Sequence, residues 1–128
     1  MKQQEIVNEI RRMCGNVKFI PSLGWHFKYK KQVYFYVVGK DETMIRFCIP
    51  FVVGLPLQNK EQLKEAVNDT NKNVKYTKAL LSGKDEVKVS LDYGHKITDK
   101  ESTKNIVPHI IKTLDFAVGY LEKRVREK

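Results

Sequence analysis

Hydrophobic residues near the amino terminus recur at the spacing of an amphipathic helix. Ile6, Val7, Ile10 and Met13 fall on one side of such a helix. Gly15 follows soon after and is typical of a helix C-terminus. The pattern therefore predicts a first helix that ends near Gly15 and packs its apolar side against a core.

The pattern then changes to the two-residue period of half-buried strands. Residues 25–31 alternate between aromatic and polar side chains, and residues 33–38 are predicted to form the antiparallel partner. A turn at residues 39–42 leads to a third strand over residues 44–53, and Pro50 predicts an edge or a strand end near that point. One side of this strand should carry four apolar residues: Ile45, Phe47, Ile49 and Phe51.

A second helix is predicted from Asn59, because Asn59 and Gln62 have the spacing of a capping box. This helix should run to about Lys72. Its buried side should consist of three residues: Leu63, Ala66 and Val67.

Two further strands follow this helix. The first is predicted near residues 74–81, and a turn at Gly83 joins it to the second. In the second strand Val87, Val89 and Leu91 alternate with polar residues. The alternation indicates that one face of the sheet is in contact with water.

The last helix is predicted to begin at a capping box made by Thr98 and Glu101 and to run to about Arg126. Pro108 lies well inside this segment, so we expect a kink or a late helix start there. The predicted order of elements is therefore α-β-β-β-α-β-β-α. The chain has 128 residues and no internal repeat or linker, which indicates one domain over residues 1–128.

This order of elements resembles that of the YbjN-like family, whose fold is similar to that of type III secretion chaperones. The segment Val67–Lys72, the following Val74–Tyr76 and the strand Glu86–Leu91 carry the resemblance. It implies an α+β fold with an antiparallel sheet of about five strands and helices packed mainly on one face. It also implies no cofactor and a protein-binding or regulatory role.

Composition and charge limit the class of protein. Hydrophobic residues make up 41% and charged residues 30%, which is typical of a globular chain. The net charge of +9 is spread along the sequence, so it serves either solubility or attraction to an anionic partner. The amino terminus has no secretory signal pattern, and the longest apolar stretch, residues 49–57, is too short to cross a bilayer. We therefore expect a cytoplasmic protein without membrane contact.

Catalytic and metal-binding patterns are absent from the sequence. His26, His95 and His109 have no partners at metal-ligand spacing, and Cys14 and Cys48 are too far apart for a CxxC motif. The glycines form no phosphate-binding loop. We therefore expect no catalytic residue, no metal and no cofactor.

The last helix has a second face beside its main apolar stripe. His109, Thr113, Phe116 and Tyr120 lie together on that face. They either pack against the first helix or form a protein interface, since aromatic residues are enriched in interface cores. We expect a two-fold homodimer that covers part of this face, with a separate polypeptide as another candidate partner.

The first hairpin offers an alternative binding surface. Lysines and tyrosines alternate there in a way that could bind single-stranded nucleic acid on the exposed sheet face, although a solvated sheet face explains them too. The residues of this alternative are Lys28, Lys30, Lys31, Tyr34 and Tyr36. The sequence thus favours a non-enzymatic, chaperone-like, protein-binding or regulatory module, followed by a basic single-stranded nucleic-acid-binding protein and then by a small-molecule enzyme.

Overall fold

The computed structural model describes residues 3–39, 43–56, 59–83, 87–98 and 102–126. These residues form three helices and six strands in the order α-β-β-β-β-α-β-β-α. The predicted turn residues 40–42, Glu86 and Glu101 lie outside the described residues. The helices are α1 (Gln3–Cys14), α2 (Lys60–Asn73) and α3 (Thr103–Arg126), and the strands are β1 (Val17–Ile20), β2 (Gly24–Tyr29), β3 (Gln32–Val37), β4 (Met44–Ile49), β5 (Thr77–Ser82) and β6 (Lys88–Lys96).

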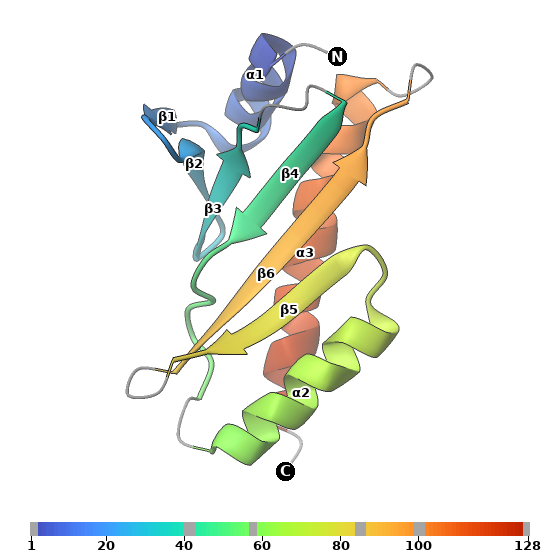
Figure 1. Ribbon diagram of the computed structural model, residues 1–128. Coiled ribbons are helices and arrows are strands. Elements are labelled where there is room, and N and C mark those ends of the chain that lie inside the picture. Colours follow the sequence, from blue (N-terminus) through green and yellow to red (C-terminus); the bar gives the residue numbers. More distant parts are fainter. Residues whose placement is uncertain (1–2, 40–42, 57–58, 84–86, 99–101, 127–128) are drawn as a thin grey trace.

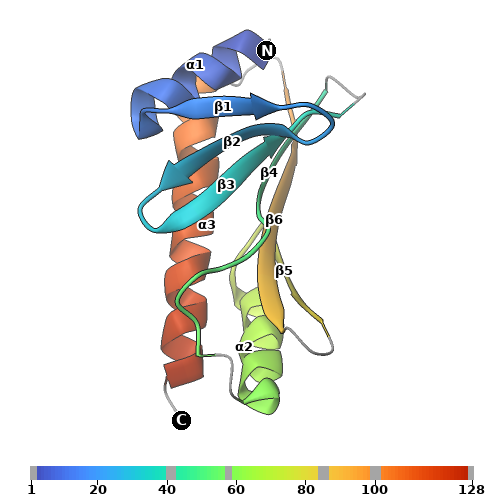
Figure 2. The ribbon, with the colours of Figure 1, turned by 90° about the vertical axis from the view of Figure 1, so that its left-hand side faces the viewer.

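The strands form one antiparallel sheet in the order β1-β2-β3-β4-β6-β5. The three helices cover one face of this twisted sheet, with α1 near β1 and β2, α3 across the middle and α2 beside β5 (Figures 1 and 2). The opposite face, which is turned toward the viewer in Figure 1, carries none of the three helices that the described residues form. The predicted α+β class with helices mainly on one face is confirmed.

Strand β1 is the element that the sequence pattern missed. It has only four residues and lies at the edge of the sheet, so its apolar residues do not repeat often enough to show a period. Phe19 of β1 lies opposite Trp25, with 5.1 Å between the ring centroids. This cross-strand pair anchors β1 to the sheet, although Phe19 remains 51% exposed.

Strand β4 ends at Ile49, directly before Pro50, because proline has no N–H to donate to the neighbouring strand. The prediction that Phe51 continues the inward side of this strand is therefore wrong, and Phe51 is exposed. Val52 is buried instead. Its backbone N–H donates to the Val89 carbonyl at 2.9 Å.

Of the two predicted helix caps, the one at Asn59 is confirmed and the one at Thr98 is wrong. The Asn59 side chain accepts hydrogen bonds from the N–H groups of Glu61 and Gln62, as expected for the start of α2. Helix α3 begins at Thr103, five residues after Thr98, so Thr98 does not cap it. The helix runs through Pro108, which lies in its second turn and removes one backbone hydrogen bond there, and no late start occurs.

The core lies between α3 and the inner face of the sheet. All eight residues of the predicted apolar stripe of α3 are buried. They pack over inward side chains of the central strands, such as Phe47, Leu91 and Tyr93. The pairing of β4 with β6 places Phe47 opposite Tyr93 and Ile49 opposite Leu91. The stripe consists of Val107, Ile110, Ile111, Leu114, Ala117, Val118, Leu121 and Val125.

The register of β6 predicts very different effects for two adjacent substitutions. Leu91 is fully buried, so Leu91→Ala should lower the free energy of unfolding by about 2 to 5 kcal/mol through lost apolar burial and a cavity. Ser90 points to the face without helices, so Ser90→Ala should change it by less than about 0.5 kcal/mol. Urea unfolding measures both values, and equal shifts would contradict the register.

Candidate functional site

The second face of α3 forms one wall of a pocket. His109, Lys112, Thr113 and Phe116 recur at helical spacing and line a hollow of about 420 Å³. His109 and Phe116 are exposed, and Thr113 is half-buried. We refer to this hollow as the α3 groove.

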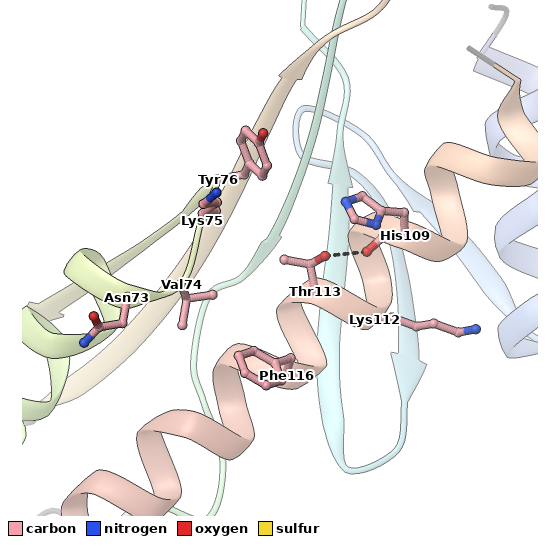
Figure 3. Close-up of a pocket in the computed structure, with 8 residues that line it drawn as sticks. All are labelled: Asn73, Val74, Lys75, Tyr76, His109, Lys112, Thr113 and Phe116. Carbon is pink, nitrogen blue, oxygen red and sulfur yellow. Dashed lines mark hydrogen bonds between the residues drawn. The ribbon is translucent and has the colours of Figure 1, made fainter.

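The opposite wall is the connection between α2 and β5, made by Asn73, Val74, Lys75 and Tyr76. Thr113 and Phe116 extend toward this connection, whereas the Lys112 side chain extends away from it (Figure 3). The first helix does not cover the face, because Phe116 is 63% exposed. Three of the four residues predicted as an interface thus line the groove.

Tyr120, the fourth predicted interface residue, fixes the connection to α3. Its hydroxyl accepts a hydrogen bond from the Asn73 side chain at 2.9 Å. One turn further along α3, the Arg124 guanidinium donates to Asp69 of α2 at 3.0 Å. These two contacts hold the end of α2 beside α3.

Asn71 holds the same connection to the sheet. Its side-chain oxygen accepts from the Ala79 N–H at 2.7 Å, and its side-chain nitrogen donates to the Ala79 carbonyl at 3.0 Å. Strand β5 is the last strand on its side of the sheet, so Asn71 satisfies backbone groups that no neighbouring strand could reach. The segment 67–72, which carries part of the family resemblance, therefore positions one wall of the groove.

Tyr76 has an unusual backbone conformation for an aromatic residue. Its φ is 66°, in the left-handed region that side chains with a Cβ rarely adopt. The residue is 69% exposed, and its ring centroid lies 6.1 Å from that of buried Tyr93. Tyr93 in turn meets the His109 ring edge-on at 6.4 Å. Residues with strained backbone conformations concentrate at functional sites, so the Tyr76 end of the groove is a candidate for ligand contact.

The lining of the groove is suited to binding apolar groups. Most of its surface is apolar, its ordinarily charged residues are Lys75 and Lys112, and no carboxylate or thiol is among the eight lining residues. Within the described residues, no group of three His, Cys, Asp or Glu side chains is arranged to hold a metal ion. An apolar side chain of a ligand could enter here. Lys75 and Lys112 give the groove residues a positive charge, although the Lys112 side chain extends away from the opposite wall.

The connection side of the groove was not predicted as a site. Val74–Tyr76 carry part of the family resemblance, and neither a positive φ nor a hydrogen bond between Asn73 and Tyr120 leaves a periodic signal in the sequence. The exposed aromatic residue at the end of a helix-to-strand connection was the one available indication.

The predicted nucleic-acid surface is not assembled as expected. Tyr34 and Tyr36 belong to the inner face, where their rings stack on Phe27 and Phe47, and their exposed fractions are 0% and 6%. Placing these two tyrosines on the exposed face is therefore wrong. Burial also raises the pKa of the Tyr36 hydroxyl.

The three lysines of that surface are also separated. Lys30 forms an ion pair with Asp115 of α3 at 2.9 Å, and Lys31 lies 3.4 Å from Glu122 of α3. Lys28 is exposed and points to the sheet face without helices, opposite Val33. Only Lys28 of the five predicted residues remains on the open face.

Comparison with known proteins shows a fold likeness. No protein-family model matches the chain, and no curated protein matches it. The structure is similar to the crystal structure of YbjN from E. coli, which is described as a candidate transcription regulator. The TM-score is 0.62 at 9% sequence identity, covering 96% of this chain and 90% of that one. The likeness confirms the predicted fold. Among the described residues, no helix has the length and apolar character needed to cross a membrane.

Asn71 provides a test of how the groove is built. Asn71→Ala removes both contacts to Ala79, whose side chain is buried, so the free energy of unfolding should fall by about 1 to 3 kcal/mol. Asn68 is exposed on the same helix, and Asn68→Ala is the matched control with an expected change below about 0.5 kcal/mol. Urea unfolding compares the two, and equal stability would show that Asn71 does not hold β5.

The cysteines provide a pH-dependent test. Burial raises the pKa of the Cys14 thiol to about 11 and also raises the pKa of Cys48. The reactive thiolate of Cys14 is therefore scarce until the pH approaches 11. At pH 8, alkylation of Cys14 should be at least about tenfold slower than that of an ordinary thiol. Mass spectrometry of labelled peptides measures the rate, and an ordinary rate in the folded protein would contradict the burial of this thiol.

Proposed function

We propose that this protein is a regulatory, protein-binding module whose α3 groove holds an apolar side chain from an acidic polypeptide segment. The observation that supports the proposal most is the exposure of Phe116 on the wall of a largely apolar hollow. No substrate chemistry is needed for such a role.

Two exposed aromatic residues on facing walls favour a protein ligand. Phe116 and Tyr76 are 63% and 69% exposed and belong to the two sides of the groove. Aromatic side chains are enriched among residues that dominate binding energy, particularly next to a pocket that can take a partner's side chain. A ligand between them would remove apolar area from water on both walls at once.

Charge favours an acidic ligand over a second copy of the chain. Lys75 and Lys112 belong to the groove lining, whose described residues include no carboxylate. Two copies facing each other across this groove would bring like charges together, whereas acidic residues flanking an apolar anchor would be complementary. The homodimer expected from the sequence stays a prediction and is an outcome of the experiment below.

The fold likeness is compatible with a regulatory role. YbjN of E. coli is described as a candidate transcription regulator. At 9% identity the likeness concerns the fold, so regulation by this chain rests on the groove and its two aromatic residues.

Two-dimensional NMR with a defined probe tests the proposal. The probe is a short acidic peptide with one central tryptophan, and its comparison peptide has alanine in place of the tryptophan. We expect the first peptide to shift the amide signals of Val74, Tyr76, Thr113 and Phe116, and to bind at least about tenfold more tightly than the second. Phe116→Asp should abolish this preference.

Phe51→Asp is the matched control, because Phe51 is another exposed phenylalanine and lies away from the groove. It should bind the tryptophan peptide as the wild type does. Shifts spread evenly over the surface, or equal binding of both peptides, would contradict the groove. Light scattering over a range of concentrations gives the remaining outcome: a dimer that Phe116→Asp dissociates would make a second copy the occupant and overturn the acidic polypeptide.

A further inference from the structure

The open face of the sheet presents a continuous row of outward side chains. Cross-strand pairing aligns one residue from each strand, so the row crosses all six strands. Neighbouring strands are about 4.8 Å apart, which gives the row a length of roughly 24 Å. In spatial order the row is Lys18, His26, Phe35, Cys48, Asp92 and Lys78.

An aromatic pair occupies the second and third positions of the row. His26 and Phe35 are directly opposite on β2 and β3, with 5.8 Å between ring centroids and 33° between ring planes. Both are half-buried, so their neighbours support them while part of each ring stays accessible. Aromatic side chains on an open sheet are stacking surfaces for unpaired bases.

Positive charge is spread over the same face. Lys28, Lys88 and Lys96 also point outward, as do Lys18 and Lys78 at the ends of the row. None of these five lysines has an ion-pair partner among the described residues. An extended polyanion that lies across the sheet could therefore contact both the aromatic pair and several of these lysines.

Among the described residues, few carboxylates lie at outward positions of the strands. Asp92 is the one carboxylate at an outward strand position in the described part of the chain, and Arg46 pairs with it through hydrogen bonds of 3.0 Å. The other described carboxylates belong to the helices: Glu5, Glu9, Glu61, Glu65, Asp69, Asp115 and Glu122. Seven of the eight described carboxylates thus lie on helices and not at outward positions of the sheet.

A glycine in β6 leaves open space on the outward side of the sheet. Gly94 lies opposite Arg46 on the outward side, and a Cβ added there would meet no atom within 4 Å. Glycine inside a strand often marks a place where a ligand approaches the backbone closely. The space beside Arg46 is therefore open to a ligand.

We propose that the open face binds single-stranded nucleic acid, with bases stacked on Phe35 and His26 and phosphates near the lysines of the same face. The row is long enough for about four nucleotides, the lower end of the range for small sheet-based binding domains. Self-association through this face is disfavoured, because it would place the lysines of two copies against each other. This function is independent of the α3 groove, which lies on the helical side of the sheet.

Fluorescence anisotropy with a labelled oligothymidine of about twelve nucleotides tests the proposal. Phe35→Ala should weaken binding by about tenfold while leaving the salt dependence unchanged. Lys18→Ala should reduce the slope of log affinity against log salt by about 0.7, the value for one phosphate contact on a single strand. Circular dichroism establishes that each variant is folded.

Phe51→Ala and Lys64→Ala are matched controls for an exposed phenylalanine and an exposed lysine that are not members of the row, and both should bind as the wild type does. NMR spectra of the wild type with the oligonucleotide add evidence that needs no variant, since the signals of Phe35 and Gly94 should shift. Unchanged binding by Phe35→Ala, shifts confined to the helices, or equal affinity for duplex DNA or polyglutamate would overturn the proposal.

Discussion

The contact between α3 and the inner face of the sheet is the interaction on which the rest of the structure depends. Its buried stripe runs almost the full length of the helix, from Val107 to Val125, and covers the central strands. Because α1 and α2 pack on the same side, the whole core lies on one face of the sheet. The second face of α3 is therefore available to line a groove, and none of the described helices covers the other face of the sheet.

Strong periodicity made much of this fold predictable. The stripe of α3, the alternation around Leu91 and the cap at Asn59 all have local signals, and each was confirmed. The orientation of β3 had no such signal, because Tyr34, Phe35 and Tyr36 put aromatic residues on both sides of the strand. Pairing with β2 and β4, which sequence alone does not show, directs both tyrosines inward.

The candidate site was predictable to the same limited extent. Helical spacing indicated the α3 side of the groove, because His109, Thr113 and Phe116 repeat along one helix face. The other wall depends on side-chain contacts between distant positions, such as Asn73 with Tyr120, which have no periodic pattern. The Gln32 side-chain amide makes a similar pair of hydrogen bonds with the backbone of Val53, each at 2.8 Å, and no sequence pattern predicts them.

Native-state hydrogen exchange tests most directly whether the α3–sheet contact organises the molecule. If it does, the slowest amides should lie in α3, β4 and β6, and the free energy calculated from their exchange should equal that of global unfolding in urea. The edge strand β1 and the groove wall from Asn73 to Tyr76 should exchange through smaller, local openings. Exchange of α3 amides at a free energy well below that of global unfolding would contradict the account.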